Sequence, residues 1–392
     1  MGKINGNGNL TAKDRKQFEV NFRNLDPQLR NLFIPEEFGG SGSQDVNLSF
    51  AFIRELALTN PDLAFCLAQH HIGTYALARW YRNTKNTSQH EGLSDIFSRL
   101  VDGRLTAIVI ASSEKGESSR HPKRTSLSNG VVLGIKDYCT NTLDINDISR
   151  NVFLVSVAIP KADDDEVQRM GSAVVIGDPR FVDPQPESQG MTFPETSTSP
   201  VHFNSAPIYS ELLSISGEIG QWYPSSRLMG AVGMGCLMSV FLGILQSISM
   251  ELHYQAESSQ TLQIYDDILE KFVNRYEELG IHINKNAVLD ENNVALLAEM
   301  LALKVDMTAF IHGHEAFNSN FPINLDEVYH FAEQLDIATG KNSEFSDLKG
   351  KLRILWRLTP LKSAASVSGN GSDQAWRFLR AFTAGEDTSK II

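Results

Sequence analysis

The sequence has little cysteine, and this scarcity bears on both compartment and metal binding. Its 392 residues include only three cysteines, Cys66, Cys139 and Cys236, and none belongs to a C-x-x-C pair. Free thiols are typical of a reducing cytosol, whereas a disulfide framework or a structural zinc site needs more cysteines at closer spacing. The first residues are polar and rich in Gly and Asn, without an apolar signal core. We therefore expect a cytoplasmic protein with no metal site.

Positive charge is also in short supply. Lys and Arg number 35 against 47 Asp and Glu, which gives a net charge of −12. Such a balance argues against a nucleic acid or an anionic membrane surface as partner, although a local basic patch could still bind a phosphate. We find no P-loop, Rossmann glycine fingerprint, zinc-ligand spacing or Ser/His/Asp order in the sequence.

Long apolar runs are absent, with one exception. The stretch from Leu228 to Met250 carries no charge, and its length would suit a membrane span. It also contains four glycines and is the only such run in the chain. A helix buried on all sides inside a helical domain explains it better than a membrane span does, so we expect no membrane association.

The order of patterns along the chain predicts an α+β protein. Apolar residues recur at helical spacing over 47–58 and 61–81, and again over 225–254, 258–279, 292–317, 324–337, 346–368 and 373–384. Between these regions lie short β-rich runs at 106–111, 131–135, 152–158 and 172–176, then a proline-rich loop over 178–199. We expect an N-terminal helical domain over 1–100, a middle β domain over 101–215 and a C-terminal helical domain over 216–392.

Two short motifs at opposite ends of the chain suggest a family. The segment 33–42, Phe-Ile-Pro-Glu-Glu-Phe-Gly-Gly-Ser-Gly, resembles the I-P-E-E-[YF]-G-G-x-G signature of acyl-CoA dehydrogenases. Residues 386–391, Glu-Asp-Thr-Ser-Lys-Ile, resemble that family's E-G-T-x-x-I segment, whose glutamate is the catalytic base in many members. The resemblance implies a fold with an N-terminal helical domain, a middle β-barrel-like domain and a C-terminal helical bundle.

Two further segments resemble the family's flavin-binding motifs. Residues 113–119, Ser-Glu-Lys-Gly-Glu-Ser-Ser, are similar to the T-E-P-x-A-G-S-D loop, and 134–141, Gly-Ile-Lys-Asp-Tyr-Cys-Thr-Asn, to the G-x-K-x-[WYF]-I-T-N strand. By resemblance, FAD is the implied cofactor, with Ser113, Ser119, Tyr138 and Thr140 as its contacts. Small hydroxyls can bond flavin oxygens and N5, and an aromatic ring can shield the flavin from water. A surface turn followed by a strand with an ordinary core tyrosine is the alternative.

The remaining site residues follow from the same resemblance. Arg227 matches the arginine that opens the family's C-terminal domain, and Gly369 and Gly371 match its G-G-x-G turn near FAD. Glu386 is the implied base that removes the proton alpha to a thioester carbonyl. Departing from the family pattern, a basic cluster that includes Arg120, Lys123 and Arg124 could attract the phosphates of CoA or of a carrier-protein arm.

The leading functional prediction is α,β-dehydrogenation of an acyl thioester, carried by CoA or by a carrier protein. The expected partners are an electron acceptor such as an electron-transfer flavoprotein or oxygen, and further copies of the chain in a homodimer or homotetramer. Two alternatives remain open: a flavin-dependent monooxygenase of the same fold, and a catalytically silent binding or assembly relative. The silent relative is suggested by the lack of the family's R-x-x-F-G element between 259 and 294.

Adjacent histidines at 70 and 71 offer no metal pair, because neighbouring residues on a helix point to different faces. We expect His70 and His71 to divide into one core or pocket residue and one exposed residue.

Overall fold

The computed structural model describes residues 12–84, 87–112, 114, 124–142, 147–160, 169–185, 196, 198–218, 224–255 and 260–286. The chain separates into two compact units. The first combines Met1–Ser49 with Asp62–Met229, and the second combines Phe50–Pro61 with Gly230–Ile392. The helices predicted after residue 292 lie outside the described residues, and the three predicted domain boundaries stay predictions.

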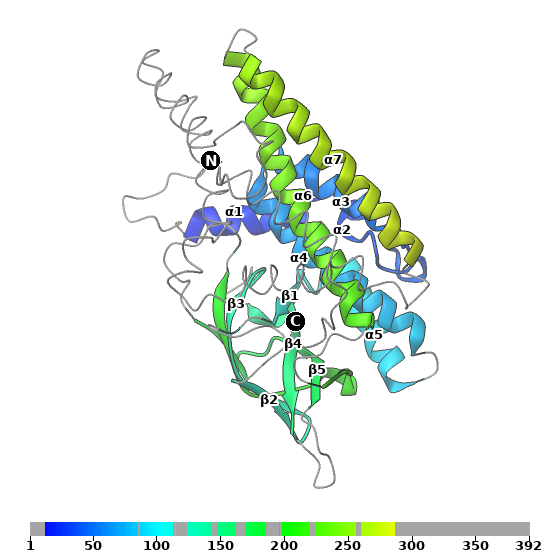
Figure 1. The fold of residues 1–392 in the computed structure, drawn as a ribbon. Coiled ribbons are helices and arrows are strands. Elements are labelled where there is room, and N and C mark those ends of the chain that lie inside the picture. Colours follow the sequence, from blue (N-terminus) through cyan, green and yellow to red (C-terminus); the bar gives the residue numbers. More distant parts are fainter. Residues whose placement is uncertain are drawn as a thin grey trace. The chain divides into compact units, whose positions relative to one another are not determined.

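The helices at the start of the chain (Figure 1) fall in the first unit, except for Phe50–Pro61, which belongs to the second. They are α1 (Ala12–Arg23), α2 (Pro27–Arg30), the 3-10 turn η1 (Glu36–Phe38), α3 (Val46–Ala57), α4 (Pro61–Asn83) and α5 (Ser88–Val101). Local sequence explains several of their starts: the Asp26 side chain accepts a hydrogen bond from the Gln28 amide, and Thr87 caps α5 by accepting one from the His90 amide. The predicted helices 47–58 and 61–81 correspond to α3 and α4.

The Ile-Pro-Glu-Glu-Phe-Gly-Gly motif forms a tight turn around η1. Gly39 has φ of +89°, a left-handed conformation that favours glycine, and a Cβ on Gly40 would lie 2.1 Å from the Ile34 carbonyl oxygen. Phe38 packs against Phe97 of α5, with ring centroids 5.7 Å apart. In this structure the motif therefore forms a turn and supplies an aromatic side chain that packs against α5, which are contributions to the fold.

Eight strands form one mixed sheet in the first unit. They are β1 (Ala107–Ala111), β2 (Thr125–Ser128), β3 (Val131–Cys139), β4 (Asn151–Ile159), β5 (Arg169–Ile176), β6 (Val182–Pro184), β7 (Ser199–Pro207) and β8 (Leu213–Glu218). The order is β6-β7-β3-β2-β4-β5-β8, with β1 added parallel to β4. Two 3-10 turns, η2 (Ile148–Arg150) and η4 (Tyr209–Glu211), connect strands.

Alternating side chains of the sheet build two separate cores, as the period of two along a strand requires. On one side, Val109, Phe153 and Val175 join a core made by the strands themselves. On the other side, Ile108 and Val152 pack against the apolar face of α4 and α5. Apolar residues on both sides explain why β1 and β4 read as nearly continuous apolar runs.

The sheet also extends beyond the strand predictions. The four predicted runs correspond to β1, β3, β4 and β5, whereas β2, β7 and β8 were not predicted. The region 178–199, predicted as loop, contains the short strand β6. These strands pair with partners that are distant in the sequence, as when β7 pairs with β3 from Val131 to Cys139, and their alternating stretches, such as 201–204 and 213–216, are only about four residues long.

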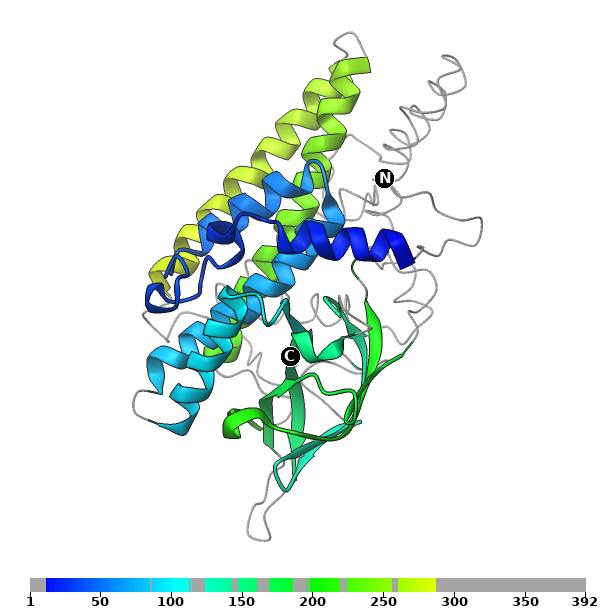
Figure 2. The same cartoon turned by 180° about the vertical axis from the view of Figure 1, so that it is seen from behind.

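The described part of the second unit includes two long helices, α6 (Pro224–Gln255) and α7 (Gln260–Asn286), which run side by side in both views (Figures 1 and 2). Close packing in this unit depends on glycine: a Cβ on Gly235 would lie 2.2 Å from the Phe50 ring, and one on Gly243 would lie 2.3 Å from the Arg54 carbonyl oxygen. The buried Tyr276 hydroxyl donates to the Gly235 carbonyl at 2.8 Å.

Within the described residues, one helical segment is long and apolar enough to cross a membrane, Leu228–Ser247 of α6. Two-thirds of it, 67%, is buried within the protein, as expected for a core helix. This agrees with the interpretation of the uncharged run as a buried helix. The predicted cytoplasmic location stays a prediction.

Candidate flavin site at the end of strand β3

Strand β3 ends in a short polar segment that carries two of the predicted flavin contacts. Tyr138 leaves 43% of its surface exposed, whereas Thr140 is buried. The pairing of β3 with β7 shifts register between Lys136 and Cys139, so the strand bulges just before this segment. Asn141 follows with φ of +72°, a left-handed conformation that asparagine tolerates better than most residues and that ends the strand.

A chain of three threonine hydroxyls lies beside this strand end. Thr140 Oγ1 is 3.0 Å from Thr198 Oγ1, which is 2.8 Å from Thr196 Oγ1. The Asn141 amide donates to the Thr196 carbonyl at 3.2 Å, and Cys139 pairs with Ser199 in the β3–β7 ladder. Thr140 is therefore held by the hydrogen bond between its own hydroxyl and Thr198, and by the backbone pairing of its two neighbours, Cys139 and Asn141.

Asn141 ties the same strand end to two other elements. Its side-chain amide donates to the carbonyls of Cys66 on α4, at 2.8 Å, and of Ile108 on β1, at 3.2 Å. The Ile108 amide donates in turn to His70 Nδ1 at 3.2 Å. Because both backbone groups of Ile108 are bonded by side chains, α4, β1 and the end of β3 form one rigid polar junction.

Both adjacent histidines are buried, so the prediction that one of them is exposed was wrong. His71 Nδ1 is 2.7 Å from the Ser49 hydroxyl, and its Nε2–H donates to the Leu29 carbonyl at 2.8 Å. Burial lowers the pKa of His71 to about 4, and burial together with the neighbouring His71 and Arg30 lowers the pKa of His70 well below its ordinary value. Both rings are therefore neutral at pH 7, and both are structural.

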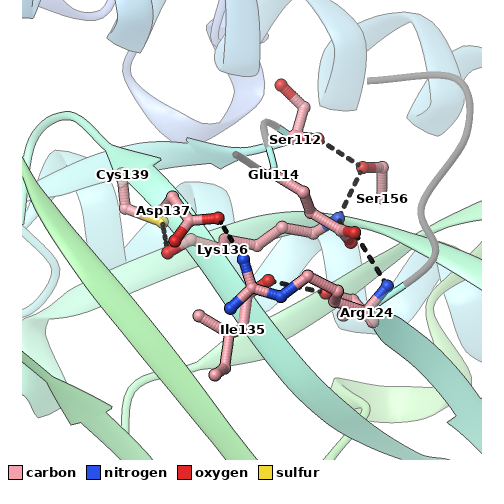
Figure 3. Close-up of polar contacts among 9 residues, drawn as sticks. Ser112, Glu114, Arg124, Ile135, Lys136, Asp137, Cys139 and Ser156 are labelled. Atoms are coloured by element: carbon pink, nitrogen blue, oxygen red, sulfur yellow. Dashed lines mark hydrogen bonds and ion pairs between the residues drawn. The ribbon is translucent and has the colours of Figure 1, made fainter. Parts of the chain in front are cut away.

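A buried ion pair holds the neighbouring loop residue Glu114 to β3 (Figure 3). Lys136 Nζ lies 2.8 Å from Glu114 Oε1 and 3.2 Å from the Ser156 hydroxyl of β4. Their side chains are 0% and 1% exposed, so the pair is fully withdrawn from water. Ser156 donates to the Ser112 carbonyl at 3.1 Å, which ties the residue before position 113 to the same cluster.

The charges in this cluster are balanced by hydrogen bonds. Burial alone would raise the pKa of Glu114, but hydrogen bonds from Lys136 and from the Arg124 amide, the latter at 2.7 Å, outweigh it and lower that pKa. Burial lowers the pKa of Lys136, and the hydrogen bond to Glu114 opposes this. The Arg124 side chain points away from the pair and bonds Asp137 at 2.8 Å (Figure 3). Arg124 was predicted to bind a phosphate; in this structure its guanidinium forms an ion pair with Asp137.

Most of the other predicted site residues lie outside the described residues. These are Ser113, Ser119, Arg120, Lys123, Gly369, Gly371 and the predicted base Glu386. Arg227 belongs to the first turns of α6. Of the predicted flavin contacts, Tyr138 and Thr140 are the two whose positions the structure gives, and it places them two residues apart at the same strand end.

Sequence reasoning missed the residues that support this site. Thr198 and Thr196 lie in a stretch predicted as loop and carry no local signal. Glu114, Lys136 and Asn141 belong to the two quoted motifs, and only the structure shows what they bond. Among the described residues there is no group of His, Cys, Asp and Glu that could hold a metal ion.

The arrangement suits a flat, polar-edged cofactor. The partly exposed Tyr138 and the buried Thr140 are two residues apart at the strand end, and the hydroxyl oxygen of Thr140 keeps bonding capacity beyond its bond to Thr198. Ser199 also has a buried hydroxyl without a partner among the described residues. Burial raises the pKa of the Cys139 thiol, so no reactive thiolate competes with such a cofactor here.

Comparison with known proteins gives no match by sequence but extensive matches by structure. No family model matches the chain, and no curated protein is similar to it in sequence. The structure of KijD3 in complex with FMN and dTDP-3-amino-2,3,6-trideoxy-4-keto-3-methyl-D-glucose superposes with a TM-score of 0.73 at 15% identity, covering 95% of this chain and 87% of KijD3.

Two further solved structures are similar over nearly the whole chain. FMN-bound TdsC from Paenibacillus sp. A11-2, a dibenzothiophene monooxygenase, has a TM-score of 0.68 at 15% identity and covers 97% of this chain and 98% of its own. A nitrososynthase from Micromonospora carbonacea var. africana has a TM-score of 0.68 at 14% identity, covering 94% and 88%. The predicted fold, α+β of the acyl-CoA dehydrogenase type, is confirmed.

The prediction of a divergent acyl-CoA dehydrogenase was wrong, because the similar structures are FMN-binding proteins and monooxygenases that share only the fold. The Ile-Pro-Glu-Glu-Phe-Gly-Gly motif led to this prediction because it forms a turn that packs against the core, and proteins that share the fold but catalyse different reactions can share such a turn. The predicted cofactor FAD is not confirmed either, since the named ligand of KijD3 and TdsC is FMN.

Proposed function

We propose that this chain is a flavin-dependent monooxygenase that binds FMN and uses molecular oxygen to oxidise a small electron-rich substrate. The single observation that carries the proposal is the fold match over 94–97% of the chain to KijD3, TdsC and the nitrososynthase. At such low identity the match supports a class of chemistry and leaves the individual substrate open. Bound reduced flavin supplies the electrons that activate oxygen in this class.

FMN suits this chain better than FAD for a reason in the sequence. The family element R-x-x-F-G, which contacts FAD across a dimer interface in acyl-CoA dehydrogenases, is absent between residues 259 and 294. FMN lacks the adenylate half of FAD and needs fewer contacts. Since the sequence also lacks a Rossmann fingerprint for a nicotinamide cofactor, we infer that a separate reductase supplies the reduced flavin.

The residues of this chain would hold and shield the flavin. Thr140 offers a hydroxyl to the edge of the ring, and Tyr138 offers an aromatic face that keeps water away from it. The junction of Asn141 with α4 and β1 and the Lys136–Glu114 pair keep this strand end rigid. A rigid polar edge in a dry site strengthens each hydrogen bond to the flavin.

The substrate class follows the chemistry of the comparison proteins. The ligand of KijD3 is an amino sugar nucleotide, and TdsC was solved with indole and named for dibenzothiophene. Each presents an electron-rich nitrogen, sulfur or aromatic ring. We propose that the substrate here is likewise an electron-rich amine, thioether or aromatic compound, and that a thioester is not oxidised.

The test compares two reactions of the same purified protein. With FMN reduced beforehand and oxygen present, a panel of amines, thioethers and indoles should yield a product containing one oxygen atom from isotopically labelled O2. With oxidised FMN and no oxygen, a panel of acyl thioesters should leave the flavin oxidised. Bleaching of the flavin by a thioester would overturn the proposal.

A matched variant sharpens this test. Glu386→Gln keeps side-chain size and removes the carboxylate that a dehydrogenase needs as its base, a loss that would lower flavin reduction by about 10²-fold or more. Under the proposed function, the variant should oxygenate the substrate at a rate close to that of the wild type. Loss of oxygenation in E386Q together with retained FMN binding would contradict this expectation, because it would show that Glu386 takes part in the reaction.

A further inference from the structure

The hydroxyl chain Thr140–Thr198–Thr196 can take two proton arrangements that run in opposite directions. Each hydroxyl can donate one hydrogen bond and accept two, so the protons of the row can all point one way along it or all point the other way. In one arrangement Thr196 donates to Thr198 and Thr198 donates to Thr140, which leaves the Thr140 proton pointing outward. In the other, every bond reverses and the Thr140 oxygen accepts from outside.

The two arrangements match the two redox states of a flavin. The ring atom N5 is an acceptor when the flavin is oxidised and carries a hydrogen when the flavin is reduced. When its proton points outward, the Thr140 hydroxyl can donate to N5 of the oxidised flavin. When its proton points along the row, the Thr140 oxygen can accept a hydrogen bond from N5–H of the reduced flavin. The reversal turns hydroxyl protons and leaves the oxygen atoms at 3.0 and 2.8 Å from one another.

We propose that Thr198 and Thr196 are positioning residues that let Thr140 switch between donor and acceptor as the flavin is reduced, so that both redox states bind well. This inference rests on the proposed function, because it needs a flavin beside Thr140. Its particular content is that Thr198 and Thr196, which are distant from Thr140 in the sequence but adjacent to it in space, control the preference between redox states.

Burial makes the second threonine necessary. Thr140, Thr198 and Thr196 are 8%, 5% and 0% exposed, so water is a poor substitute for a missing partner. If Thr198 loses its hydroxyl, Thr140 can still donate to oxidised N5. When Thr140 instead accepts from reduced N5–H, its own proton is left buried without an acceptor, which is the costly case.

The experiment measures dissociation constants for oxidised FMN and, without oxygen, for reduced FMN. For Thr198→Val we expect the constant for reduced FMN to rise about tenfold, which corresponds to about 1.4 kcal/mol, and that for oxidised FMN to rise no more than about threefold. Thr198→Ser restores a hydroxyl and should behave as the wild type. Thr196→Val, one link further away, should show the same preference to a smaller degree.

Thr142→Val is the matched control. Thr142 is a fully buried threonine of the same strand end, and its hydroxyl donates to the Cys139 carbonyl at 2.9 Å, outside the chain of three. Its substitution should leave the ratio of the two constants unchanged. This variant separates general damage to the strand end from loss of the switch.

Each outcome decides something. If T198V and T196V both weaken the two redox forms equally, the inference is wrong while the proposed function stands. If the wild type binds neither form of FMN, the proposed function itself is wrong and the inference is overturned with it. Should T198V fail to fold, T196V and T198S still decide between a redox-dependent and a uniform effect.

Discussion

Replacing Lys136 by methionine tests the buried ion pair that supports the candidate site. Methionine keeps most of the side-chain volume but removes the charge, so Glu114 stays 1% exposed without its ionic partner. Its other hydrogen bonds, which include one from the Arg124 amide at 2.7 Å, do not neutralise a carboxylate. Breaking a buried pair on one side typically destabilises a protein by about 3–5 kcal/mol, against a total stability of roughly 5–15 kcal/mol.

The double variant Lys136→Met with Glu114→Leu removes both charges and should recover most of this loss. Exchanging a whole buried pair for apolar residues is often neutral or stabilising. Urea unfolding followed by circular dichroism at pH 7 gives the free energies of the wild type, both single variants and the double variant. A double variant as unstable as K136M would refute the reasoning, because the loss would then come from packing and not from an unpaired charge.

Arg124→Met supplies the control from the same cluster. Its guanidinium pairs with Asp137 at 2.8 Å, but the Arg124 side chain is 40% exposed (Figure 3). An exposed pair contributes about 1 kcal/mol or less, and the Arg124 amide that bonds Glu114 is unchanged by the substitution. We therefore expect a loss several times smaller than that of K136M. Equal losses in the two variants would contradict the argument from burial.

Three further predictions concern the same unit. Thr140→Val should weaken FMN binding by about 0.5–1.5 kcal/mol through the loss of one hydrogen bond, measured by titration, and unchanged affinity would remove Thr140 from the site. His71 is neutral in the folded protein with a pKa of about 4, against about 6.5 in the unfolded chain, so stability is complete above pH 6.5 and falls by about 3 kcal/mol as pH drops to 4. His71→Gln should flatten the stability profile between pH 6.5 and 5, and an unaltered slope would count against the assignment. In Gly73→Ala the new Cβ would lie 2.3 Å from Ile108 Cγ2, so the loss should be about 1–3 kcal/mol in thermal unfolding; Ile108→Ala in the same chain removes Cγ2 but keeps Cβ at 2.9 Å, so it should relieve only part of the overlap.

Local patterns in the sequence were enough to predict the strands and helices whose apolar residues form a continuous run or a helical period. The runs that became β1 and β4 carry apolar side chains for the cores on both sides of the sheet, and α3, α4 and α6 show their apolar surface within one continuous segment. The α+β fold class followed from their order. For α7 the pattern located the helix and placed its end seven residues early, at 279 against Asn286, because the last turns are mostly polar.

Tertiary structure decided the rest, because the relevant partners are far apart in the chain. Thr140 meets Thr198 across 58 residues, Asn141 meets Cys66 across 75, and Lys136 meets Glu114 across 22. No local period records such pairs. His71 shows the same limit: neighbouring residues on a helix point to different faces, so one of the two histidines was expected to be exposed, but helix α4 is covered where Ser49 and the Leu29 carbonyl approach it. The amino-acid sequence alone located several segments that form the core, whereas only the tertiary structure added β2 and β7 to that core and decided which polar groups meet at the end of β3.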